Sequence, residues 1–103
     1  MMLPQKIAEL VRELRERTES GSINWKYDDD NGSVEASLTQ PNIDVAIAYR
    51  FDTIEEVGTF RIDIFDKNKS QALIFNTTQN YSDFELVRAL YDSAQASGFN
   101  FSF

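Results

Sequence analysis

The sequence predicts an α+β domain: a five-stranded antiparallel meander sheet with an N-terminal and a C-terminal helix packed on one face. Three observations lead to this prediction. Apolar residues recur at helical spacing near both ends of the chain, and between them they alternate with polar residues in five rows. Residues typical of turns separate those rows. A chain of 103 residues is most simply a single domain, which we place at residues 1–103.

Both predicted helices have one apolar side. The apolar residues of the first are Leu3, Ile7, Leu10, Val11 and Leu14. Gly21 is predicted to end this helix in a left-handed conformation. The second is predicted to begin at Ser82, with Glu85 completing a capping box, and to end at Gly98. Its apolar residues are Phe84, Val87, Leu90, Tyr91 and Ala94.

The five alternating rows predict the strands. They fall within residues 23–27, 34–38, 43–51, 60–64 and 73–75. When the turns are closed about Asn31-Gly32, Pro41-Asn42, residues 55–58 and Lys67-Asn68, the apolar residues of every row come to the same face. This closure pairs Trp25 with Leu38, Ala36 with Ile47, Phe51 with Phe60, and Ile62 with Leu73. Trp25 and Tyr27 are expected in the core, where a buried indole N–H needs a hydrogen-bond partner.

Charge and composition exclude several kinds of chemistry. The formal net charge is −7, with 10 basic and 17 acidic residues, so direct binding to nucleic acid or to an anionic membrane is disfavoured. The chain has no Cys and no His, which removes disulfides, thiolate nucleophiles and the usual general base. We find no apolar run of membrane-spanning length and no secretory signal, and we therefore expect a cytoplasmic protein.

The segment YDDDNGSVEASL has the length and the glycine position of a calcium-binding loop. Such a loop needs an acidic residue first and a glutamate last, whereas Tyr27 and Leu38 occupy those places. Both also belong to the predicted core rows. We interpret the segment as a turn and assign no metal ligand and no cofactor.

Acidic residues on the outer sheet face, away from the helices, are the next candidates: Glu35, Asp44, Asp52 and Asp63. Lys26, Arg50 and Arg61 are predicted beside them. We interpret this group as exposed ion pairs, since a catalytic pair would need a pocket and a shifted pKa. No catalytic residue is assigned.

A small apolar patch on the same outer face is a candidate protein-binding surface. Its predicted members are Ala46, Ala48, Phe65, Ala72 and Ile74. Three aromatic residues close to the C-terminus also need something to pack against: Phe99, Phe101 and Phe103. They are expected to join a sheet edge, cover the core or contact another chain.

Four segments resemble a group of small uncharacterised bacterial proteins: TESGSINW (residues 18–25), EASL (35–38), IDIFDKN (62–68) and LYDSAQ (90–95). That group shares a helix, a GxIxW strand entry, a meander and a closing helix. Gln95 stands where the group has arginine. The resemblance implies a bacterial or mobile-element setting and transfers no activity.

These observations lead to one expected function and two alternatives. We expect a non-catalytic protein-interaction module of the accessory, immunity or mobile-element type that uses its acidic surface and its outer sheet face. Its partner is expected to be a protein with a basic surface or a second copy of the chain. The first alternative is a small-molecule or metal-dependent activity in a carboxylate pocket. The second is an acidic mimic of nucleic acid.

Overall fold

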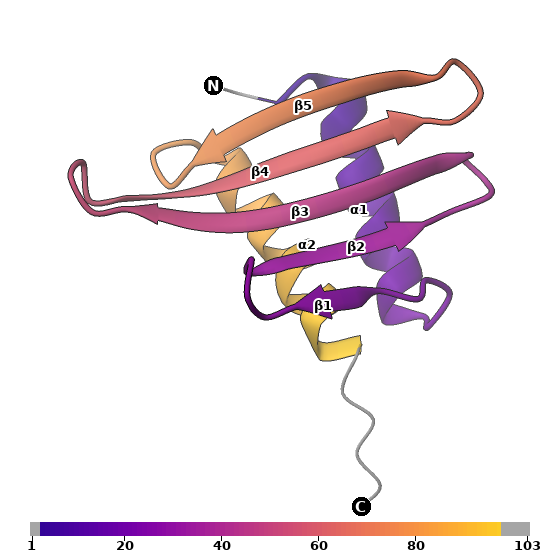
Figure 1. The fold of residues 1–103 in the computed structure, drawn as a ribbon, viewed down its shortest axis with the longest axis horizontal. Coiled ribbons are helices and arrows are strands. Elements are labelled where there is room, and N and C mark those ends of the chain that lie inside the picture. The colour runs from indigo at the N-terminus through magenta and orange to yellow at the C-terminus, as the bar shows by residue number, and fades with distance from the viewer. Residues whose placement is uncertain (1–2, 98–103) are drawn as a thin grey trace, which may run out of the picture.

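The computed structural model describes residues 3–97 and confirms the predicted α+β architecture (Figure 1). One antiparallel sheet has its strands in the order β1-β2-β3-β4-β5, so each strand pairs with its neighbours in sequence. The elements are α1 (Gln5–Glu19), β1 (Lys26–Asp28), β2 (Ser33–Ser37), β3 (Ile43–Asp52), β4 (Val57–Asp66), β5 (Gln71–Thr78) and α2 (Asp83–Ser97).

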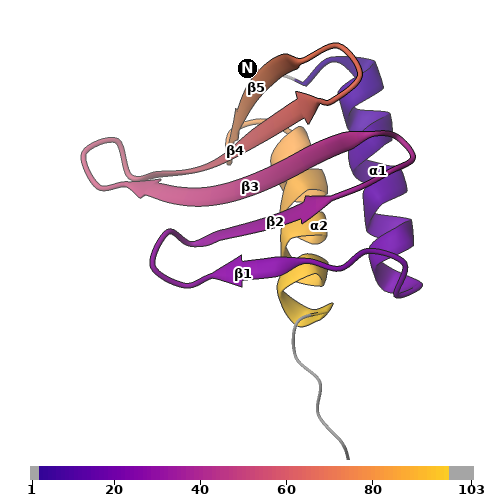
Figure 2. The same ribbon diagram turned by 45° about the vertical axis from the view of Figure 1, so that its right-hand side comes forward.

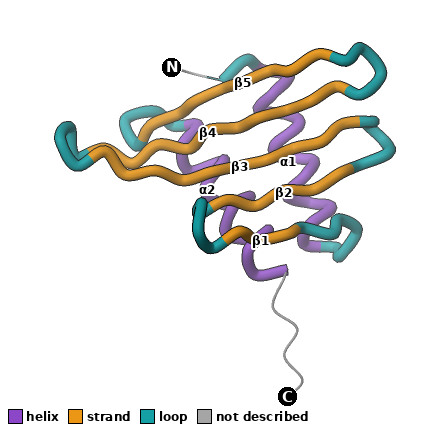
Figure 3. The backbone as a smooth tube through the Cα atoms, viewed as in Figure 1, coloured by secondary structure: helices purple, strands orange, loops and turns teal. Residues whose placement is uncertain are grey.

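Both helices lie on the same side of the sheet, side by side, and no helix among residues 3–97 lies on the other side (Figures 2 and 3). The apolar residues predicted for the two helices and the central strands meet between these layers in one core. The largest side chains with almost no exposure are Leu14, Ile47, Ile62 and Leu90. The alternation along the strands therefore assigned the buried face of the central strands correctly.

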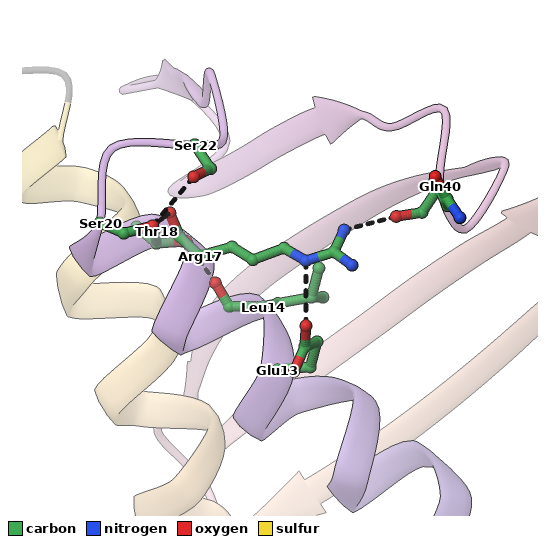
Figure 4. A network of polar contacts seen from close by, with 7 residues as sticks. All are labelled: Glu13, Leu14, Arg17, Thr18, Ser20, Ser22 and Gln40. Atoms are coloured by element: carbon green, nitrogen blue, oxygen red, sulfur yellow. Dashed lines mark hydrogen bonds and ion pairs between the residues drawn. The ribbon is translucent and has the colours of Figure 1, made fainter.

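The C-terminus of α1 confirms the predicted role of Gly21. Gly21 has a φ of 80°, its N–H donates to the carbonyl of Thr18, and the N–H of Ser22 donates to the carbonyl of Arg17 at 2.8 Å. These two bonds form a Schellman motif, which pairs carbonyls that the helix leaves free. Arg17 also donates to the carbonyl of Gln40, and so joins the helix end to the β2–β3 connection (Figure 4).

Trp25 is buried, as predicted, and its indole N–H has a partner. Trp25 Nε1 donates to Thr18 Oγ1 at 2.8 Å, and Thr18 Oγ1 donates to the carbonyl oxygen of Leu14 at 2.6 Å. This chain of two hydrogen bonds ties the segment before β1 to the inner side of α1.

The strand registers differ from the prediction by two residues at every turn. Trp25 was expected opposite Leu38, but β1 pairs Lys26 with Glu35 and Tyr27 with Val34. The other pairs are Ala36 with Val45, Ile47 with Ile62, Tyr49 with Phe60, and Ile62 with Phe75. Each turn is centred one residue away from its predicted place, and four residues connect β1 to β2, β3 to β4, and β4 to β5. Because side chains alternate with a period of two, this error leaves every residue on its predicted face.

Three aromatic residues assigned to the apolar rows are more exposed than predicted. Tyr27, Tyr49 and Phe51 are 40%, 41% and 51% exposed. For Tyr49 and Phe51 the reason is the length of the β3–β4 hairpin, which extends past the helix layer beyond α2 (Figure 1). No helix among residues 3–97 covers the inner face of that hairpin arm. Tyr27 lies on β1, the short strand at one edge of the sheet.

Candidate protein-binding face

The outer sheet face brings three of the predicted patch residues together. Phe65 of β4 lies directly opposite Ala72 of β5, and Ile74 is the next residue on the same face of β5. Phe65 and Ile74 are 40% and 52% exposed. β5 has a paired neighbour on one side only, so this part of the patch lies at the margin of the sheet.

The two alanines of the predicted patch lie on β3, in the middle of the sheet. Ala46 and Ala48 are half-buried, and their partners across β4 are Asp63 and Arg61. Ala46 was expected opposite Phe65 and Ala48 opposite Asp63, and both pairings are wrong by the two-residue shift. The apolar surface is therefore interrupted by one ion pair, since Arg61 Nε lies 2.8 Å from Asp63 Oδ1.

An open depression of about 750 Å³ lies over this face. Its walls include the apolar side chains of Ala46, Phe65, Ala72 and Ile74. They also include charged residues of both signs: Lys26, Glu35, Asp44, Arg61 and Asp63. The face thus combines an apolar strip with charges of both signs, two basic and three acidic.

Asp44 has an altered pKa on this face. A hydrogen bond with Ser37 and the nearby Lys67 lower the pKa of Asp44, against a smaller opposing effect of desolvation. Lys67 Nζ lies 3.4 Å from Asp44 Oδ1 and donates to Ser37 Oγ at 2.9 Å. A lowered pKa keeps the carboxylate charged at neutral pH, whereas a general acid needs a raised one.

The four candidate carboxylates do not form one group. Glu35 pairs across strands with Lys26, and Asp63 with Arg61, while Asp52 lies at the far end of β3. Asp52 Oδ1 accepts the N–H groups of residues 54 and 55 and so shapes the β3–β4 turn. Across residues 3–97, no three acidic side chains gather closely enough to hold a metal ion.

The turns closed as predicted would also place Asp28 opposite Glu35 and Arg50 opposite Arg61, and both pairings are wrong because of the register. Asp28 does not face Glu35, since its partner is Ser33, and Arg50 does not face Arg61, since its partner is Thr59. Like charges expected opposite each other are thus separated.

The segment tested as a calcium loop is a turn, as interpreted. Asp28 Oδ1 accepts the N–H groups of Asp30 and Asn31 at 3.1 and 3.3 Å. Asp28 Oδ2 accepts from the Asn31 side chain at 2.6 Å. The first carboxylate of the run therefore stabilises the turn itself.

Comparisons of the chain with protein-family models, curated proteins and solved structures gave no significant match. The resemblance to small bacterial proteins stays an expectation. No helix among residues 3–97 is long and apolar enough to cross a membrane. The candidates Phe99, Phe101 and Phe103 lie outside the described residues.

Sequence reasoning missed a second exposed apolar group, on the β3–β4 hairpin. Ile54 is 93% exposed at its tip, and Phe51 lies just before the tip. The available signal was an isoleucine in a turn, between Asp52 and Glu55, where polar residues are usual.

Proposed function

We propose that this protein is a non-catalytic module that binds another protein through its outer sheet face. The observation that carries the proposal is the exposed strip of Phe65, Ala72 and Ile74 on a sheet face that has no helix over it. Aromatic and aliphatic side chains in a desolvated centre provide most of the energy of protein interfaces. The charges of both signs around the strip supply the polar rim that such interfaces have.

Two kinds of partner match this surface. The negative net charge of the chain favours a protein with a basic surface. A second copy of the chain also fits, because a surface with paired charges of both signs can be complementary to itself. An accessory or immunity-type role in a bacterial cell is our proposal for its setting, supported by the resemblance of the sequence.

Binding of a small molecule is the second candidate function. The depression on the outer face has a volume of about 750 Å³, which is within the range of ligand sites. Three of the candidate carboxylates line it: Glu35, Asp44 and Asp63. It ranks below protein binding because Asp44 and Asp63 already have cationic partners.

The experiment compares the natural chain with the variant Phe65→Asp in two measurements. The first is light scattering after size exclusion over a range of concentrations. The second is retention of proteins from an extract of the source organism, with each retained protein purified and titrated. Phe65→Leu is the matched control, because it keeps an apolar side chain at the same place.

We expect self-association or a specific partner that Phe65→Leu retains and Phe65→Asp loses. If Phe65→Asp retains every interaction of the natural chain, the outer face is not the contact surface. A small molecule that binds the monomer and is released by Asp63→Asn would favour the second candidate.

A further inference from the structure

The meander brings three connections to one end of the molecule. They join β1 to β2, β3 to β4 and β5 to α2 (Figure 1). Counted with one flanking residue on each side, they are residues 28–33, 52–57 and 78–83. We call these three segments the acidic end, because they are rich in acidic residues.

The acidic end carries the whole net charge of the protein. Its three segments contain seven of the 17 acidic residues and none of the 10 basic ones. The other ten acidic and ten basic residues balance. The connections at the opposite end, counted in the same way, contain three lysines and two acidic residues.

Exposed apolar side chains gather at the same end. The described residues include seven large exposed apolar side chains, and five of them lie within the three segments or up to three residues from them. Arg50, between Tyr49 and Phe51, is the one basic residue within the range that these five define. They are Tyr27, Tyr49, Phe51, Ile54 and Tyr81. The other two, Phe65 and Ile74, belong to the outer sheet face.

Contacts join the three connections into one surface. The carbonyl of Gly32 accepts the N–H of Tyr49 at 3.1 Å and the hydroxyl of Tyr91 at 2.8 Å. The Tyr49 ring packs on Phe60 and lies so close to Gly58 that a Cβ there would be 2.7 Å from its hydroxyl. Gln79, at the start of the third connection, exchanges hydrogen bonds with the backbone of Gly58.

We propose that the acidic end binds a basic segment of a partner protein, whose apolar side chains pack on Tyr49, Phe51 and Ile54. Lysine or arginine side chains of that segment pair with the carboxylates of the surrounding connections. This inference rests on the proposed function, because both assume that the chain binds a protein. It concerns a different surface and specifies the chemistry of the partner.

Charge decides the kind of partner. A second copy using the same end would bring seven negative charges against seven, and nucleic acid would meet the same repulsion. A basic segment instead removes the self-repulsion of the end as it binds. The exposed aromatic side chains then supply the contact area that charge pairs alone do not give.

The probe is a fluorescein-labelled synthetic peptide of 16 residues that combines lysines with leucines and phenylalanines. One control peptide has glutamine in place of every lysine, and another has serine in place of every apolar residue. Binding is measured by fluorescence anisotropy at low and at physiological salt.

Two triple variants separate local charge from total charge. Asp30→Asn, Glu55→Gln and Glu56→Gln remove three of the seven negative charges of the acidic end. Glu9→Gln, Glu13→Gln and Glu16→Gln remove the same charge from the exposed side of α1. A third variant, Phe51→Ser with Ile54→Ser, removes apolar contact, and Phe65→Asp tests the outer face.

We expect the natural chain to bind the lysine peptide and to bind each control peptide at least about tenfold more weakly. The triple variant of the acidic end should weaken peptide binding roughly tenfold, because it removes carboxylates that pair with the bound lysines. The triple variant of α1 should weaken binding less than about twofold, because its charges lie away from the peptide and are screened by salt. The serine variant should weaken binding and Phe65→Asp should leave it unchanged.

Equal losses for the two triple variants would overturn the proposal, because binding would then depend on total charge alone. Absence of binding by the natural chain would also overturn it. Loss of peptide binding on Phe65→Asp alone would transfer the contact to the outer face, and so would support the proposed function while removing this inference.

Discussion

The two buried threonines are expected to respond in opposite directions to the same substitution. Thr18 and Thr77 are 5% and 0% exposed. Thr18 Oγ1 accepts from Trp25 and donates to the carbonyl of Leu14. Thr77 Oγ1 has no hydrogen-bond partner among the described residues. Valine has nearly the shape of threonine but no hydroxyl, so the change isolates the polar group.

Thr18→Val should lower the free energy of unfolding by about 1–3 kcal/mol, because it leaves the indole N–H of Trp25 unpaired in the core. Thr77→Val should raise it by about 1 kcal/mol, because an unpaired hydroxyl no longer has to be desolvated on folding. Valine also suits a strand at least as well as threonine does. The two variants should therefore differ by roughly 2–4 kcal/mol.

Urea unfolding followed by circular dichroism measures both changes, with the fluorescence of the single tryptophan as a second probe. Thr78→Val is the control, since Thr78 is the next residue along β5, is half-buried and should change stability by less than about 0.5 kcal/mol. In a Trp25→Phe background, Thr18→Val should lower the free energy of unfolding by much less, because there is no indole N–H left to lose its partner. A destabilising Thr77→Val, or a neutral Thr18→Val, would refute the reasoning.

Three further outcomes are expected from the same unfolding assay. Gly21→Ala should lower the free energy of unfolding by about 1 kcal/mol. The added Cβ meets no neighbouring atom, so the loss comes from the positive φ, which residues with a side chain disfavour. An unchanged free energy of unfolding would contradict this. Gly58→Ala should destabilise by roughly 1 kcal/mol by displacing the ring of Tyr49, and the same change in a Tyr49→Ser background should cost clearly less. Burial raises the pKa of Tyr91, and the nearby Tyr27 raises it further. The folded state therefore favours the neutral phenol, and this contribution to the free energy of unfolding is complete below about pH 10. It is lost as the pH rises through the raised pKa. Tyr91→Phe should therefore lose less stability above pH 10 than the natural chain, and parallel curves would refute this.

The sequence predicted the layers of the fold but not how its strands are aligned. Alternation determines which face a residue occupies, and a register shifted by two residues satisfies the same pattern. Choosing between such registers requires the residues at which each turn begins and ends. Residues such as Asp28 and Asp52, which accept N–H groups two residues further along the chain, indicate where a turn begins better than the Asn31-Gly32 pair does.

Burial at the ends of the strands could not be predicted for a different reason. Tyr49 and Phe51 continue the alternation of β3, but their exposure depends on where α2 stops covering the sheet. That limit is a property of the packed layers and leaves no local pattern in β3. The same holds for the acidic end, because residues 28–33, 52–57 and 78–83 are far apart in the chain and meet only through the meander.

The two proposed surfaces differ most in how salt should affect them. On the outer face, Arg61 lies beside Asp63 and Lys67 lies beside Asp44. The electrostatic fields of these paired charges largely cancel. The three connections of the acidic end contain seven acidic residues and no basic residue, and Arg50 lies two residues before Asp52. A partner of the acidic end should therefore associate more slowly as salt is added, while the association rate of a partner of the outer face should change less, and measured association rates distinguish the surfaces without any substitution.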